Sequence, residues 1–147
     1  MACVAHLFQA PKRRLPMEAV ESIEAVAGLG FSGCAHARKN SGRQVLLVDK
    51  ETLDAMQLHP GMIRENITTE GLNINGLGMG EQLRIGPVLV QVSAVCTPCD
   101  QLEKVRPGLR REMYGRRGML CRVLEGGVIR VGDAIRRVAS AASAQAY

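Results

Sequence analysis

Aromatic residues are almost missing from this sequence, which has two Phe, two Tyr and no Trp among 147 residues. Proteins that bind nucleic acid commonly stack bases on aromatic side chains beside a basic stripe. We therefore expect no nucleic-acid partner, although the formal net charge is +5. This surplus fits a compact anionic ligand better, and the core must be built from Val, Leu, Ile, Met and Ala.

Long hydrophobic runs are also missing, and no stretch approaches the ~20 apolar residues that a helix needs to cross a bilayer. The N-terminal residues lack the pattern of a secretory signal. The cysteines are odd in number, five in all, which does not suit a complete set of disulfides. We expect a cytoplasmic protein in a reducing compartment, with no membrane partner.

The length of 147 residues suits one domain. At this size a domain buries roughly 70% of the surface of its unfolded chain and needs no disulfide or metal to fold. Repeats, linkers and low-complexity blocks are missing from the sequence. We expect a single domain over residues 1–138, followed by a tail of small polar residues at 139–147 that we expect to be disordered.

Short apolar stretches separated by glycine-rich turns dominate the pattern. Residues 44–48 form a continuous aliphatic run, which predicts a fully buried strand. Further strands are predicted at 3–8, 67–69, 82–85, 88–95, 119–124, 128–131 and 134–138, with a hairpin at Glu125-Gly126-Gly127. Residues 51–58 predict a short helix and 101–105 a helical turn, whereas 20–26 fits a strand or a helix. The fold class is therefore mainly β, a barrel or sandwich with one or two short helices.

The motif Cys96-Thr97-Pro98-Cys99 directly follows the predicted strand 88–95. Such a pair can supply a reactive thiol, half of a zinc site or a reversible disulfide. A structural zinc needs two further ligands, and no second motif of this kind provides them. A thioredoxin-type site needs a parallel βαβ context, which the pattern does not show. Two further readings stay open: a redox disulfide, and thiols that are simply buried in the core.

Arginines stand at the start of two predicted strands, Arg43 before 44–48 and Arg64 before 67–69. A guanidinium donates two parallel hydrogen bonds to a phosphate or carboxylate, and Asn66 and Thr68 could add neutral donors. The alternative for Arg64 is a surface ion pair with Glu65 and no ligand.

Two other segments offer anion-binding or acid–base groups. Arg117 lies in Gly115-Arg116-Arg117-Gly118, where flexible glycines let backbone amides and cations approach an anion. His36 lies in a loop and is either a site residue or a hydrogen-bonded surface histidine. The glycine-rich stretch 71–80 lacks the Lys-Ser/Thr ending of a P-loop, so we predict no nucleoside triphosphate site.

Taken in order along the chain, these segments resemble the MOSC domain, named for the C-terminal region of molybdenum cofactor sulfurase. The resemblance runs from about residue 28 to 138 and depends on the order and spacing of its pieces. The pieces are Gly33-Cys34-Ala35-His36, Gly42-Arg43-Gln44-Val45, the segment from Pro60 to Thr68 with Arg64-Glu65-Asn66, Gly80-Glu81-Gln82-Leu83, Pro98-Cys99-Asp100-Gln101-Leu102, Arg117-Gly118, Glu125-Gly126-Gly127 and Val131-Gly132-Asp133.

The resemblance implies a MOSC-type β-barrel in which Cys99 ligates molybdenum or accepts sulfur as a persulfide. It also implies that the pterin and phosphate of the molybdenum cofactor, a small anionic ligand, are held by Arg43, Arg64, Asn66, Thr68, Arg117 and His36. Some stand-alone members reduce N-hydroxylated compounds, so a reductase that takes electrons from a donor protein is one expectation. The aminotransferase-like region of the large sulfurases is absent, so we expect no pyridoxal-phosphate site.

One position departs from the family pattern, because relatives usually carry Asp where this chain has Cys34. Losing that carboxylate puts an acid–base or metal-positioning role of the loop in doubt. It also supports an alternative, a non-catalytic module that delivers cofactor or sulfur to a partner enzyme. The lesser alternative is a thiol-redox protein that uses Cys96 and Cys99.

Overall fold

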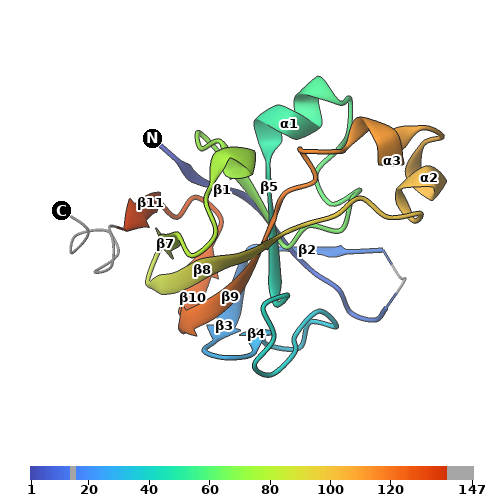
Figure 1. The fold of residues 1–147 in the computed structure, drawn as a ribbon. Coiled ribbons are helices and arrows are strands. Elements are labelled where there is room, and N and C mark those ends of the chain that lie inside the picture. Colours follow the sequence, from blue (N-terminus) through green and yellow to red (C-terminus); the bar gives the residue numbers. More distant parts are fainter. Residues whose placement is uncertain (14–15, 139–147) are drawn as a thin grey trace.

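The computed structural model describes residues 1–13 and 16–138, so the tail predicted at 139–147 lies outside the described residues. In the described part the chain forms eleven strands, three short α-helices and one 3-10 turn (Figure 1). The helices are α1 (Lys50–Ala55), α2 (Leu102–Val105) and α3 (Leu109–Glu112). The mainly β class is thereby confirmed, but the count of one or two helices was one too low.

The strands form one large and one small sheet. The large sheet has the order β11 (Ile135–Val138), β7 (Gln82–Ile85), β8 (Val88–Val95), β9 (Met119–Glu125), β5 (Val45–Asp49), β6 (Ile67–Glu70), β1 (Cys3–Gln9) and β2 (Glu18–Val20). Its neighbours are antiparallel except for the parallel pair β5 and β6. The small sheet has the order β10 (Gly127–Arg130), β3 (Ser22–Val26) and β4 (Gly30–Phe31).

The closed barrel that the resemblance implies stays a prediction. The order of the large sheet is that of an open sheet, with β11 and β2 at its two edges. Main-chain contacts nevertheless join the start of β1 to the start of β11, through a bridge between Cys3 and Ala134 and a 2.9 Å hydrogen bond from the Ile135 N–H to the Ala2 carbonyl.

The central strand β5 is buried on both faces, as its continuous aliphatic run predicts. Successive side chains of a strand point to opposite sides. Val45 and Leu47 therefore enter the apolar cluster between the sheets, whereas Leu46 and Val48 enter a second cluster formed with the helices. Figure 1 shows the three helices gathered on one side, with the small sheet at the opposite end of β5. Most of the predicted site residues lie in the segments that lead into β5, β6 and β9, or in the segment that follows β8.

The structure settles two local questions. The segment 20–26, which fitted strand or helix, lies in strands β2 and β3. The predicted hairpin at 125–127 is wrong, because β9 and β10 belong to different sheets and β10 pairs with β3. Gly126 permits this change of sheet, since a Cβ there would lie 2.6 Å from the Ala25 carbonyl oxygen. No helix of the described residues is both long and apolar enough to cross a membrane.

Candidate cofactor cavity

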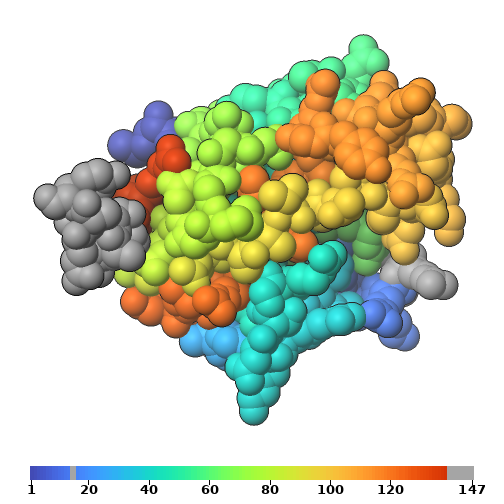
Figure 2. Space-filling view, viewed as in Figure 1, coloured from blue at the N-terminus to red at the C-terminus, as the bar shows by residue number. Residues whose placement is uncertain are grey.

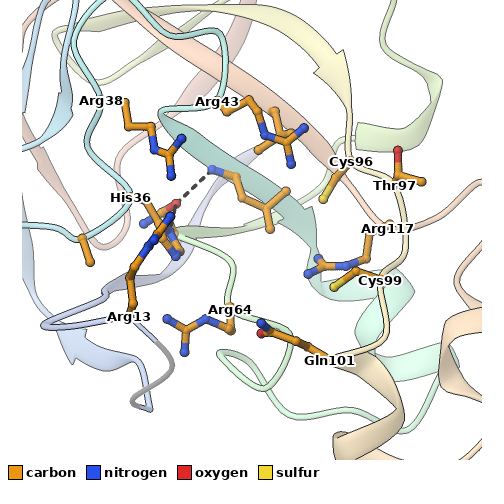
Figure 3. A pocket seen from close by; sticks show the side chains of 14 residues that line it. Arg13, His36, Arg38, Arg43, Arg64, Cys96, Thr97, Cys99, Gln101 and Arg117 are labelled. Atoms are coloured by element: carbon orange, nitrogen blue, oxygen red, sulfur yellow. Dashed lines mark hydrogen bonds between the residues drawn. The ribbon is translucent and has the colours of Figure 1, made fainter.

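A cavity of about 580 Å³ opens between three segments. They are the loop after β4, the turn before β6 and the segment that follows β8. The loop between β4 and β5 stands out from the body of the molecule (cyan in Figure 2) and forms one wall. We call this space the arginine cavity, and Figure 3 shows the labelled arginines, His36, Cys96 and Cys99 arranged around it. The lining residues are Arg13, Ala35, His36, Arg38, Arg43, Leu46, Arg64, Asn66, Cys96, Thr97, Cys99, Gln101, Arg117 and Leu120.

The loop that carries Arg38 and Arg43 is fastened by a buried amide. Gln44 is 1% exposed, and its Nε2 donates to the Arg38 carbonyl at 3.0 Å while its Oε1 accepts the Val123 N–H at 2.9 Å. The Ser93 hydroxyl donates to the Gly42 carbonyl in the same loop. Both bonds connect the loop to strands β8 and β9, which fixes the backbone from which the two arginines project into the cavity.

The turn before β6 is held by a buried carboxylate. Glu65 is 0% exposed, and its Oε2 accepts both the Gly61 N–H and the Thr68 hydroxyl at 2.9 Å. Glu65 is therefore an internal brace and not half of a surface ion pair. Thr68, which we predicted to hold the cofactor, is fully buried as well and does not line the cavity. Arg64, at φ 66°, does line it.

Asn66 fixes the orientation of His36. The buried Asn66 Oδ1 accepts the Leu46 N–H at 3.0 Å and lies 3.3 Å from Nδ1 of His36 (Figure 3). Because a main-chain N–H can only donate, this atom of Asn66 must be the oxygen, and Nδ1 of His36 must carry the proton. In the neutral ring Nε2 is then the acceptor.

Burial is the largest influence on the pKa of His36, and it lowers that pKa below its ordinary value. The hydrogen bond with Asn66 acts in the opposite direction, whereas the nearby positive charges of Arg64, Arg117 and Arg38 lower it further. His36 is thus a neutral imidazole at pH 7, and negative charge placed in the cavity would favour its protonation.

Cys34 lies behind Asn66 and outside the cavity. Its Sγ accepts the Ala10 N–H at 3.3 Å and the Asn66 Nδ2–H at 3.5 Å, and the residue is 6% exposed. The sulfur therefore acts as a hydrogen-bond acceptor at the position where the family resemblance leads us to expect Asp.

Arg117 is the most unusual cation of the cavity. The residue is 7% exposed, and its Nη2 donates to the Ile63 carbonyl at 2.8 Å. Its Nε and Nη1 are buried without any hydrogen-bond partner. Leaving buried charged donors unpaired is unfavourable, so the arrangement is suited to an anion that enters the cavity and accepts both bonds.

The two thiols of the Cys-x-x-Cys motif both line the cavity, but they differ in exposure. Cys99 is exposed and Cys96 is buried. Burial raises the pKa of the Cys96 thiol, against the opposite effect of Arg117 and Arg43. Cys96 is therefore held as a neutral thiol, and Cys99, located just before α2, is the sulfur that a ligand can reach.

The structure thus brings six of the seven predicted site residues to one cavity: His36, Arg43, Arg64, Asn66, Cys99 and Arg117. The sequence did not single out Arg13 and Arg38, although both stand in short basic runs, and it gave no role to Gln44 or Glu65. The lining contains five arginines and no Asp or Glu among the described residues.

This set of donors can be tested against the cofactor that the family implies. No cluster of three or more His, Cys, Asp and Glu side chains within the described residues could enclose a bare metal ion. One accessible thiol beside several guanidiniums instead fits an anionic metal complex that brings its own ligands, because thiolate is a soft ligand and guanidinium binds phosphate. The unpaired donors of Arg117 are where a phosphate would fit best.

Comparisons with known proteins identify the family of the chain and relate its fold to solved structures. The MOSC domain model matches residues 35–136. Among solved structures, YiiM from Geobacillus stearothermophilus superposes with a TM-score of 0.78 at 19% identity, over 95% of this chain and 76% of that one. The YUAD protein from Bacillus subtilis gives 0.74 at 19% over 92% and 94%, and YiiM from Escherichia coli gives 0.69 at 20% over 92% and 70%. A search of curated protein sequences finds no match. Since the family model covers most of the chain, this protein belongs to the MOSC domain family.

Proposed function

We propose that the arginine cavity binds the molybdenum cofactor, with Cys99 as the protein's sulfur ligand to the metal or as a persulfide acceptor. One observation carries the proposal. The same cavity contains a buried guanidinium, that of Arg117, with two unpartnered donors, and an accessible thiol, that of Cys99. The family is associated with molybdenum-cofactor chemistry, which agrees with this assignment.

The chain's own residues would divide the work between binding and proton handling. Arg117 and Arg43 would bind the phosphate and Arg64 would face the pterin. Asn66 is fully buried and would act indirectly, by holding His36 in place. His36, whose Nδ1–H is held by Asn66, presents Nε2 as a group that can take up a proton when negative charge enters. The cofactor supplies redox chemistry at its metal when bound. We expect reduction of N-hydroxylated compounds, with electrons from a donor protein in the cytoplasm.

The test is the cofactor content of protein purified from a molybdenum-replete host. We expect molybdenum and pterin in near-equal amounts in the wild type, loss of molybdenum in Cys99→Ser, and loss of both in Arg117→Met. Cys3→Ser is the matched control, because Cys3 is a free thiol that does not line the cavity. The proposal fails if wild type and Cys99→Ser are both empty and the wild type forms no persulfide on Cys99.

A second candidate is a module that delivers cofactor or sulfur to a partner enzyme. The observation that favours it is the exposure of Cys99, which leaves its sulfur open to another protein. Stoichiometric transfer to an acceptor without turnover would support delivery, whereas Cys99-dependent turnover of N-hydroxylated substrates with a reductase would support the enzyme.

The thiol-redox alternative uses the fact that Cys96 and Cys99 line the same cavity. Mild oxidation followed by counting of free thiols tests it. Loss of two thiols in the wild type and of none in Cys96→Ser would favour a reversible disulfide.

A further inference from the structure

A second cavity of about 440 Å³ adjoins the arginine cavity and shares two lining residues with it, Arg64 and Gln101. Its other walls are mostly apolar, and we call it the apolar cavity. They include Phe8, Met17, Pro60 and Met62, with Lys104 as the one further cation among the described residues. Its volume lies within the range of small-molecule sites.

The two cavities suit different parts of a ligand. Guanidiniums dominate the first, which fits phosphate and other anionic groups. An aromatic ring and two thioethers dominate the second. Methionine sulfur and aromatic faces pack favourably against aromatic rings, and methionines adapt to ligands of different outline. The apolar cavity therefore fits a planar aromatic group better than an aliphatic chain or a sugar.

The walls of the apolar cavity are held in place by contacts within the protein. The Phe8 ring is 7% exposed and lies so close to the turn that a Cβ on Gly61 would be 2.9 Å from its Cε1. Glu65 holds the same turn through the Gly61 N–H. Met62 is 41% exposed. Its Sδ accepts the His59 N–H at 3.2 Å, and this bond keeps the thioether in place at the cavity wall.

Position and charge narrow the choice of ligand. A molecule in the apolar cavity that passes Arg64 and Gln101 enters the space that Cys99 lines. Lys104, which is exposed on α2, also lines the apolar cavity. A negatively charged substituent of the ligand could pair with its ammonium group.

We propose that the apolar cavity receives the planar aromatic body of a small-molecule substrate with an anionic substituent, and that the reacting end of this molecule reaches into the arginine cavity beside Cys99. The inference rests on the proposed function, because it takes the arginine cavity as the reaction site. It adds the class of substrate, an aromatic acid, and a role for Met62 and Lys104 as specificity-determining residues.

Calorimetric titration of the purified protein with naphthoate, its neutral amide and, separately, inorganic phosphate tests the inference. We expect naphthoate to bind the wild type and to bind Met62→Glu about tenfold more weakly, because the new carboxylate repels the ligand at short range. Lys104→Gln should weaken naphthoate about fivefold and leave the amide unchanged, as expected for loss of one exposed ion pair. Met79→Glu, a change at a methionine that is 54% exposed and lines neither cavity, is the matched control.

The phosphate titration separates the two proposals. If phosphate binds the wild type while naphthoate does not, or if Met62→Glu and Met79→Glu bind naphthoate equally, the apolar cavity is not a substrate site and the proposed function stands. Displacement of naphthoate by phosphate with no effect of Met62→Glu would place the ligand on the arginines and overturn the inference too. If phosphate does not bind at all, the proposed function itself fails.

Discussion

Replacing Arg117 by Met should separate ligand affinity from stability. In the protein without ligand, the guanidinium is 7% exposed, and two of its donors have no partner. Hydrogen bonds to charged groups contribute about 1.5–3 kcal/mol each. Loss of both bonds to a bound phosphate should therefore weaken binding by at least about 3 kcal/mol, or about a hundredfold.

The same change should not lower stability by a comparable amount. Met is an apolar side chain of similar length, and it removes the two unpaired buried donors, each of which costs about 1–3 kcal/mol. Against this gain stands the bond from Nη2 to the Ile63 carbonyl, whose loss leaves one acceptor unpaired at about 1 kcal/mol. We expect the free energy of unfolding of Arg117→Met to exceed that of the wild type by about 1–5 kcal/mol.

The measurements are calorimetric titration with inorganic phosphate and urea unfolding in a phosphate-free buffer. Arg116→Met is the matched control, since Arg116 is the exposed neighbour and does not line the cavity. Its phosphate affinity should stay that of the wild type. A variant Arg117→Met that keeps phosphate affinity, or that loses more than about 2 kcal/mol of stability, would refute the assignment of Arg117 as an unpaired anion-binding group.

Three further predictions follow from the contacts around the cavity. Burial and three arginines lower the pKa of His36, so sulfate binding should raise that pKa. Sulfate should then bind with proton uptake, and more tightly as the pH falls toward 6. Titration in buffers of different ionisation enthalpy measures this uptake, which should be missing in His36→Ala. Gln44→Leu should leave the Val123 N–H and the Arg38 carbonyl unpaired, which should lower unfolding stability by about 2 kcal/mol and weaken sulfate binding; unchanged values of both would contradict its role as a fastener. Glu65→Leu should lower the free energy of unfolding in urea by about 2–4 kcal/mol, because the Gly61 N–H and the Thr68 hydroxyl lose their acceptor. Thr68→Val should cause a smaller loss, since it removes only one of the two bonds to Glu65.

Local patterns were enough to predict most strands. The aliphatic run at β5 indicated burial on both faces because consecutive side chains of a strand point in opposite directions. The partner of a strand is a different matter. Glu125-Gly126-Gly127 has the composition of a hairpin, yet β10 pairs with β3, which is about a hundred residues earlier. Only contacts between distant segments decide that choice.

The site was predicted in part for similar reasons. The family resemblance assigned Cys99, Arg43, Arg64 and Arg117, and the structure places them at one cavity. Burial of polar side chains could not be derived from the sequence, so Gln44 and Glu65 were not recognised as the residues that fix the cavity walls. The position of Thr68 was missed for the same reason. Its hydroxyl donates a hydrogen bond to the buried Glu65, which a sequence pattern does not reveal.

The central claim is that an anion held by Arg117 and the sulfur of Cys99 share one cavity. Alkylation by iodoacetamide, followed residue by residue with mass spectrometry, tests this claim most directly. Inorganic phosphate should slow alkylation of Cys99 in the wild type, because the bound anion blocks access and offsets the positive charge of the arginines, and it should leave Cys3 unaffected. In Arg117→Met the protection should vanish. If phosphate binds the wild type and Cys99 reacts at the same rate with and without it, the anion and the thiol occupy separate places and the account is wrong.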